Sequence, residues 1–174
     1  MGRPKALVRD ESGQSWLALA TTTLLDAGCR PVLVALGAES LAARNLLPHD
    51  ARLQVVDVAD WSDGMAVSLS ASLRAALQTD AAAAVITLVD LPGLPVAVIA
   101  RVRAEIGSQR VCADTLRQAS YHGEPGHPVV IGRQHWAPLI ASLDGDSGAR
   151  RYLLAHGVIA VECGDLWHGR DVDR

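Results

Sequence analysis

Short apolar segments alternate with amphipathic segments along the whole of this 174-residue chain. The segments at 32–36 and 83–89 consist almost wholly of apolar residues, which is typical of strands that have helices on both faces. Such strands belong to parallel sheets, because a parallel connection needs a crossover that is usually a helix. The alternation therefore predicts an α/β fold, and the length is typical of a single domain.

The remaining elements follow from hydrophobic periodicity and from turn residues. Met65, Leu69, Leu73 and Leu77 recur every four residues and predict a helix over 64–78. Ser12 is a candidate N-cap for a helix over 12–28. Residues 121–128 are rich in turn formers. Other helices are expected at 38–46, 95–106, 134–143 and 147–156, and other strands at 53–58, 110–115, 129–131 and 158–161.

Composition excludes several classes of protein. Hydrophobic residues make up 49% and charged residues 20%, so intrinsic disorder is not expected. The formal charge of -3 argues against a protein that binds nucleic acid through a large positive charge. No apolar run has the roughly 20 residues of a membrane span, and the N-terminus lacks the apolar core of a signal peptide. Cys29, Cys112 and Cys163 are widely spaced and predict free thiols, not a zinc site. We expect a cytoplasmic protein.

Asp90 is the first charged residue after the apolar segment 83–89. In open parallel sheets, ligands bind beyond the carboxyl ends of the strands. A carboxylate at this point can hold Mg²⁺, which prefers oxygen ligands and shares its shell with substrate phosphates. The alternative is that Asp90 only opens the turn Asp90-Leu91-Pro92-Gly93, a role that Asp favours by itself.

Three other features are weaker candidates for chemistry. Lys5 is the only lysine beside 15 arginines, and a lone lysine is favoured where a compact ammonium is needed, although it can equally be a solvated residue near the terminus. Gly64 begins the predicted helix 64–78, whose free N–H groups can bind an anion. The alternative is an ordinary capped helix start with Trp61 packed against the protein. His127 lies between Gly126 and Pro128, where a structural role is the alternative.

Six short motifs, taken in order along the chain, resemble those of the molybdopterin nucleotidyltransferases, most closely the molybdenum cofactor cytidylyltransferase group. Each motif alone is weakly specific, but together they span nearly the whole chain. The resemblance implies a three-layer α/β/α sandwich of the nucleotide-diphosphate-sugar transferase type, with a mixed, mainly parallel sheet. The motifs are Met1-Gly2-x-Pro4-Lys5, Trp61-x-x-Gly64-Met65-x-x-Ser68-Leu69, Leu88-x-Asp90-x-Pro92, Gly126-His127-Pro128-Val129, Gly145-Asp146-x-Gly148-Ala149-Arg150 and Asp171-Val172-Asp173.

The same resemblance implies transfer of CMP from CTP to the terminal phosphate of molybdopterin, with release of pyrophosphate. Lys5 and Asp90 would be the catalytic residues, Lys5 neutralising phosphates and Asp90 holding Mg²⁺ together with Asp173. Such a transfer depends on positioning and on cations, so no protein nucleophile is needed. The implied nucleotide-binding residues are Gly2, Arg3, Lys5, Gly64 and Ser68, and the implied substrate-binding residues are Gly126, His127, Pro128, Asp146 and Arg150.

The family also has a first strand and a glycine-rich loop before the Met-Gly-x-Pro-Lys motif, and the sequence here begins at that Met. We therefore expect residues 1–174 to form one nucleotidyltransferase-like domain without that strand. The implied partners are CTP or GTP, molybdopterin and, transiently, a molybdenum enzyme or its insertion chaperone, with no nucleic acid and no membrane. A guanylyltransferase of the same fold, a non-catalytic nucleotide-binding homologue and a different phosphorylated acceptor remain alternatives.

Overall fold

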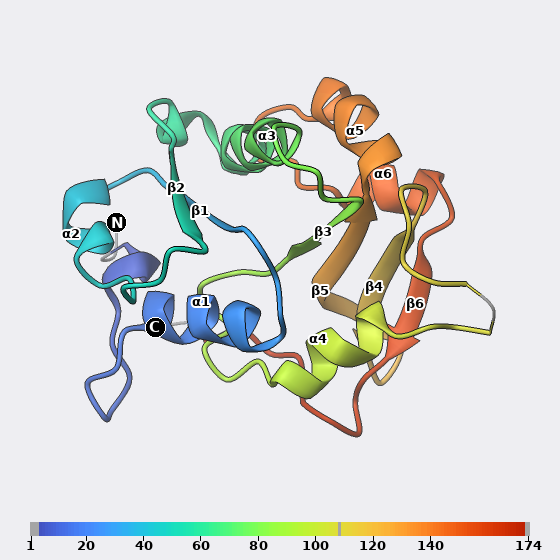
Figure 1. The fold of residues 1–174 in the computed structure, drawn as a ribbon, viewed down its shortest axis with the longest axis horizontal. Coiled ribbons are helices and arrows are strands. Elements are labelled where there is room, and N and C mark those ends of the chain that lie inside the picture. The colour runs from blue at the N-terminus through green and yellow to red at the C-terminus, as the bar shows by residue number, and fades with distance from the viewer. Residues whose placement is uncertain (1–3, 108, 173–174) are drawn as a thin grey trace.

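The strands form two sheets in the computed structural model, which describes residues 4–107 and 109–172 (Figure 1). Strands β1 (Val32–Leu36) and β2 (Leu53–Asp57) make a two-stranded parallel sheet. The second sheet has the order β3-β5-β4-β6 and consists of β3 (Ala83–Ile86), β4 (Leu116–Tyr121), β5 (Glu124–Gly132) and β6 (Ile159–Glu162). Strand β5 pairs antiparallel with β3 and β4, whereas β6 pairs parallel with β4. The predicted α/β fold with mixed pairing is confirmed.

Helices cover both faces of these strands and make three layers (Figure 1). Helices α3 (Met65–Ala76), α5 (Trp136–Ser142) and α6 (Arg150–Ala155) lie on one side. Helices α1 (Trp16–Asp26) and α4 (Val96–Arg103) lie on the other. The short α2 (Ser40–Arg44) and the 3-10 turns η1 (Lys5–Leu7), η2 (Trp61–Asp63) and η3 (Arg133–His135) complete the described elements. None of the helices in the described ranges has the length and apolar character to span a membrane.

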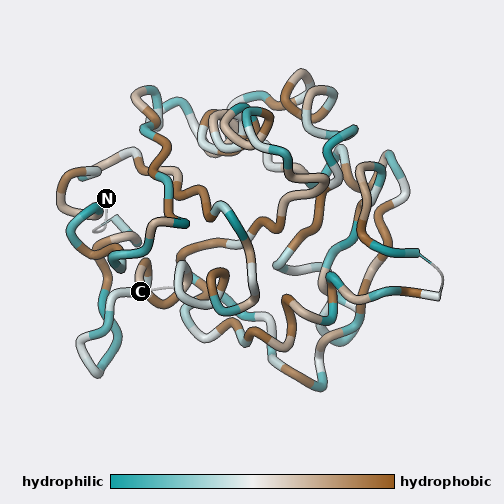
Figure 2. The backbone as a smooth tube through the Cα atoms, in the orientation of Figure 1, coloured by the Kyte–Doolittle hydropathy of each residue, from teal (hydrophilic) through white to brown (hydrophobic). Residues whose placement is uncertain are grey.

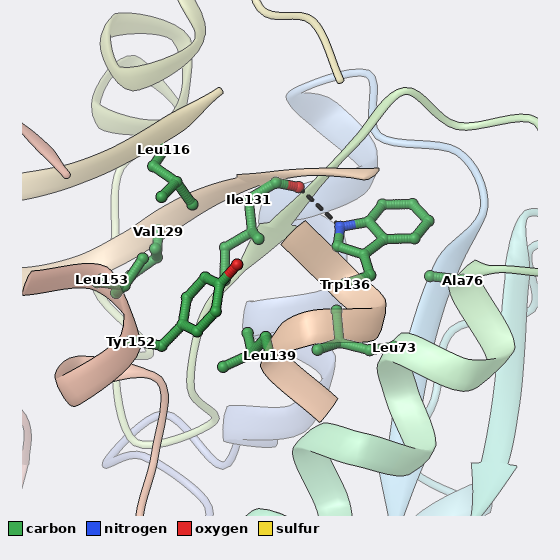
Figure 3. Close-up of a cluster of buried hydrophobic side chains, with 9 residues drawn as sticks. All are labelled: Leu73, Ala76, Leu116, Val129, Ile131, Trp136, Leu139, Tyr152 and Leu153. Atoms are coloured by element: carbon green, nitrogen blue, oxygen red, sulfur yellow. Dashed lines mark hydrogen bonds between the residues drawn. The ribbon is translucent and has the colours of Figure 1, made fainter. Parts of the chain in front are cut away.

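Each face of the four-stranded sheet has its own hydrophobic core. Trp136 is fully buried between α3 and β5, and its indole Nε1 donates a hydrogen bond to Ile131 O at 2.9 Å (Figure 3). On the opposite face, Val98 and Ile99 of α4 pack against Val130. The loop around residues 10–14 is hydrophilic (Figure 2). Burying this apolar surface on both faces holds the layers together.

A cavity of about 780 Å³ separates the two sheets. The backbone edges of β1 and β3 face it, and within the described residues no strand pairs with either of these edges. Apolar side chains from α1 and α3, among them Leu24 and Leu69, close it above and below. The sheet is therefore interrupted in the middle of the molecule, between β1 and β3.

Local contacts explain where the elements differ from the sequence-based prediction. Helix α1 begins after Ser15, whose side chain accepts a hydrogen bond from Ala18 N at 3.3 Å, so the predicted N-cap Ser12 was wrong. The strand predicted at 110–115 is a turn instead, since Cys112 N donates to Thr115 Oγ1.

Strand β5 starts already at Glu124, so the predicted turn at 121–128 is limited in the structure to His122 and Gly123. Both of these residues have positive φ, as in the two-residue turns that join antiparallel strands. Gly126, His127 and Pro128 therefore lie on a strand beside β4.

Candidate functional site

Asp90 lies in the turn that follows β3 and is only 8% exposed. Its Oδ2 accepts a hydrogen bond from Lys5 Nζ at 2.6 Å, which joins two residues 85 positions apart. Its other oxygen, Oδ1, is buried and has no hydrogen-bond partner among the described residues. Buried carboxylate oxygens normally have a partner, so this atom is a candidate ligand for a cation.

Two further polar groups are related to Asp90. Thr87 precedes it by three residues, and Val172 N is hydrogen-bonded to its backbone oxygen. Thr87 Oγ1 is likewise buried without a partner in the described part of the chain. Val172 N donates to Asp90 O at 3.0 Å, which fixes the C-terminal segment beside this turn. Asp173, predicted as a second metal ligand, lies outside the described residues, as do Gly2 and Arg3. No cluster of three or more His, Cys, Asp or Glu side chains is present in the ranges described.

His127 faces Asp90 from strand β5. Burial lowers the pKa of His127, and the negative charge of Asp90 only partly opposes that shift. The imidazole is therefore held mainly in its neutral form near neutral pH. The adjoining Pro128 is fully buried.

Two residues that sequence reasoning missed hold this segment from β4. Tyr121 Oη donates to His127 O at 2.6 Å, and Gln118 Nε2 donates to Gly126 O at 3.1 Å. A Cβ on Gly126 would lie 2.8 Å from the Tyr121 ring, so only glycine allows this approach. Neither residue belongs to a recognisable motif or to a strand that the sequence predicted, so no sequence signal pointed to them.

The turn 144–147 packs against the start of α3. Gly64 has φ +112°, and a Cβ there would lie 2.6 Å from Gly145 O and 2.7 Å from Asp146 Oδ1. Ala66 N donates to Gly145 O at 3.1 Å. The N-terminus of α3 therefore already has one of its free donors bound by the chain, which reduces the anion site expected there.

The predicted residues fall into three groups in space. Ser68, Gly126, His127 and Arg150 all line the cavity between the sheets, whose other lining is mostly apolar. Gly64 and Asp146 meet at the edge of α3. Lys5 and Asp90 form the ion pair at the end of β3 and are not part of the cavity lining. The Lys5–Asp90 pair, which suits phosphate chemistry, thus lies beside the cavity, whereas the cation Arg150 lines it.

The family model of the MobA-like NTP transferase domain matches residues 1–160. The chain belongs to this family. The nicotine blue oxidoreductase of Paenarthrobacter nicotinovorans is 32% identical over 181 residues, which cover 99% of this chain and 85% of that protein. This relative carries the name of an oxidoreductase.

Solved structures give the same fold. Rv0371c from Mycobacterium tuberculosis H37Rv is 26% identical, with a TM-score of 0.77 over 99% of this chain and 85% of that one. Its homologue from Mycobacterium sp. strain JC1 is 22% identical, with a TM-score of 0.74 over 94% and 79%. A manganese complex of Rv0371c is 23% identical, with a TM-score of 0.70 over 93% and 83%. These neighbours confirm the α/β fold of a MobA-like NTP transferase.

Proposed function

We propose that residues 1–174 act as one MobA-like nucleotidyltransferase domain that transfers CMP from CTP to molybdopterin. The observation that carries the proposal is the Lys5–Asp90 pair at the carboxyl end of β3, with Asp90 Oδ1 buried and unpartnered among the described residues. Ligands bind at this end of the strands in open α/β sheets. The CTP and molybdopterin assignments rest on the motif resemblance.

In the proposed reaction, the terminal phosphate oxygen of the acceptor attacks the α-phosphorus of CTP. The bond from that phosphorus to the α,β-bridging oxygen breaks, and pyrophosphate leaves. Phosphoryl-type transfer depends on positioning and charge neutralisation. Lys5 supplies a point charge for the phosphates, and its side chain is 44% exposed, so it can leave Asp90 when a triphosphate arrives.

The buried Asp90 Oδ1 fits a divalent cation, because carboxylate oxygens are the ligands that Mg²⁺ prefers. Asp90 would hold Mg²⁺, with Asp173 as a proposed second ligand. When bound, Mg²⁺ would neutralise charge on the triphosphate and the leaving pyrophosphate. A site with one or two protein carboxylates is usual for this ion, which keeps waters and phosphates in its shell.

The test is pyrophosphate release from CTP with molybdopterin and Mg²⁺. We expect Asp90→Asn to lower the rate by about 100-fold or more, the usual loss when a charge-stabilising contact is removed. Asp80→Asn, at an exposed aspartate just before β3, is the matched control and should keep full activity. Unchanged turnover in Asp90→Asn would contradict the proposal.

The same assay separates the near alternatives. Preference for GTP over CTP would favour a guanylyltransferase, and turnover with another phosphorylated acceptor would change the substrate. Nucleotide binding in calorimetry with no pyrophosphate release from any triphosphate would favour a non-catalytic homologue.

A second candidate function is an oxidoreductase, because the relative named for that activity matches 99% of this chain at 32% identity. Oxidation of NADH or NADPH in the presence of an organic acceptor, without pyrophosphate release from CTP, would favour it. The Asp90→Asn variant distinguishes the two functions again, since hydride transfer has no need of a metal ligand at that position.

A further inference from the structure

Residues 167–172, the last part of the chain that the structure describes, form neither a helix nor a strand. Their backbone reaches the turn that contains Asp90, where Val172 N donates to Asp90 O at 3.0 Å. A segment of this kind lacks the hydrogen-bond ladder of a sheet or a helix. Its position therefore depends on the side chains against which it packs.

Tyr121, the last residue of β4, is the side chain on which this segment packs. Gly169 has φ +71°, and a Cβ there would overlap Cδ2 and Cγ of the Tyr121 ring. The backbone of Gly169 therefore lies directly against the ring. Trp167 contacts the same ring in a T-shaped arrangement, with the ring centroids 5.7 Å apart and the planes at 80°. This geometry is one of those that aromatic pairs favour.

Trp167 also connects the segment to the turn after β3. A Cβ on Gly93 would lie 3.6 Å from Trp167 Nε1, so the indole borders the turn that begins at Asp90. The segment is thus fixed to this turn near both of its ends, by the indole and by the Val172 hydrogen bond, and the Tyr121 ring supports it between them.

The hydroxyl end of Tyr121 is fixed by β5. Its Oη donates to His127 O at 2.6 Å, and the residue is only 6% exposed. Burial raises the pKa of Tyr121, so the hydroxyl keeps its proton and stays a donor at neutral pH. A ring that is held by packing and by a hydrogen bond at its far end is a rigid support for the segment.

We propose that Tyr121 is a positioning residue that holds residues 167–172 beside Asp90. Asp173, the proposed second metal ligand, directly follows Val172 in the sequence. The place of Val172 therefore governs whether the Asp173 carboxylate can share a cation with Asp90. The expected consequence is that Tyr121 raises the affinity of this site for its divalent cation. The inference rests on the proposed function, because the cation is the one that Asp90 would hold there.

The test combines two measurements on the whole chain. Mn²⁺ binding is followed by the electron paramagnetic resonance signal of the free ion, and the hydrogen exchange of the Val172 amide is followed by NMR. We expect Tyr121→Leu to weaken Mn²⁺ binding by about tenfold or more, the usual loss when a residue that orients a metal ligand is removed. Val172 exchange should become at least about tenfold faster, because the segment loses its support. Tyr121→Phe keeps the ring and should restore most of both values.

Tyr152→Leu is the matched control for the loss of a buried tyrosine. Tyr152 is 7% exposed, lies in the core on the opposite face of the sheet, and has its Oη 2.9 Å from His135 Nδ1. Its replacement should lower the stability of the fold as Tyr121→Leu does. Mn²⁺ affinity and Val172 exchange should stay unchanged.

Gly169→Ala tests the same contact without changing the core. The added Cβ would meet the Tyr121 ring, so this variant should show the losses expected for Tyr121→Leu. Gly157→Ala is its control, because φ there is +70° and nothing lies within 4 Å of the added Cβ. The control has the same backbone strain and should change neither measurement.

Two results would overturn the positioning role. One is Mn²⁺ affinity in Tyr121→Leu and Gly169→Ala equal to that of the unsubstituted chain, and the other is Val172 exchange no faster than in the two controls. If the unsubstituted chain binds no Mn²⁺, the Asp90 cation site of the proposed function is contradicted. Faster Val172 exchange in Tyr121→Leu and Gly169→Ala alone would then still support Tyr121 as the residue that positions the segment.

Discussion

At the scale of single residues, Glu162 shows how a surface carboxylate can close a turn. Its two oxygens accept hydrogen bonds from His122 N at 2.8 Å, Gly164 N at 2.9 Å, Gly123 N at 3.3 Å and Ser120 Oγ at 2.8 Å. These donors, His122 N first, lower the pKa of Glu162 from 4.5 to about 2. Because the carboxylate form is the one that is bound, the folded state favours ionised Glu162.

This lowered pKa predicts a pH-dependent contribution to stability. A group with a depressed folded pKa stabilises the protein above its unfolded pKa, and the contribution is lost as pH falls through the folded value, here between about 4.5 and about 2. Glu162→Gln should therefore be less stable than the unsubstituted chain at pH 7, and the difference should shrink towards pH 3. Urea unfolding at the two pH values measures it. Glu124→Gln, in the same hairpin, is the control, and a difference independent of pH would refute the expectation.

Gly64 illustrates a position that must be glycine, because its neighbours leave no room for a side chain. Gly64→Ala should lower the free energy of unfolding by about 1–3 kcal/mol, the usual cost of overpacking, because a Cβ would meet Gly145 O at 2.6 Å. Gly13→Ala is the matched control: φ there is also positive, +84°, but nothing lies within 4 Å of the added Cβ. The control isolates the backbone strain. Equal losses in the two variants, measured by denaturant unfolding, would show that the contact with turn 144–147 costs nothing.

At the scale of elements, a buried arginine terminates α4. Arg117 of β4 is 1% exposed, and its guanidinium donates to Ala104 O at 2.5 Å and Gln109 O at 2.7 Å. Arg117→Met would leave these carbonyls without donors, so we expect a loss of about 3 kcal/mol in unfolding free energy. Arg110→Met, at an arginine whose side chain is 86% exposed, should change it by less than about 0.5 kcal/mol. Similar urea midpoints for both variants would show that the hydrogen bonds of Arg117 do not contribute this unfolding free energy.

Elements also show which features the sequence could predict. Apolar periodicity indicated α3 and β1 within one or two residues, since burial of one helix stripe or of both strand faces leaves a local pattern. The start of β5 escaped prediction because Gly126 and Pro128 read as turn residues, and it is the antiparallel pairing with β4 that makes this segment a strand. The approach of Lys5 to Asp90 follows from strand order in space, which a single sequence does not contain.

At the scale of the whole molecule, the cavity divides the chain into two parts with separate cores. The β1–β2 sheet packs on α1 through residues such as Leu17 and Val34. The four-stranded sheet has a core on each face, and Val130 at its centre is fully buried. Because local opening depends on the apolar contacts that each part must break, the two parts should differ in stability.

Native-state hydrogen exchange tests this division. We expect the amide of Val34 to open at least about tenfold more often than that of Val130. The reason is that the β1–β2 sheet has only two strands and packs against a single hydrophobic core. Lys5 belongs to the first part and Asp90 to the second, so a Mg²⁺-bound triphosphate that contacts both should hold the parts together.

At a ligand concentration of 100 times Kd, such binding adds up to about 2.7 kcal/mol to the opening free energy of Val34. Asp90→Asn should abolish this increase while leaving Val130 unchanged in the absence of ligand. Equal opening of Val34 and Val130 in the unliganded chain would instead mean that α3 couples the two sheets across the cavity into one cooperative unit.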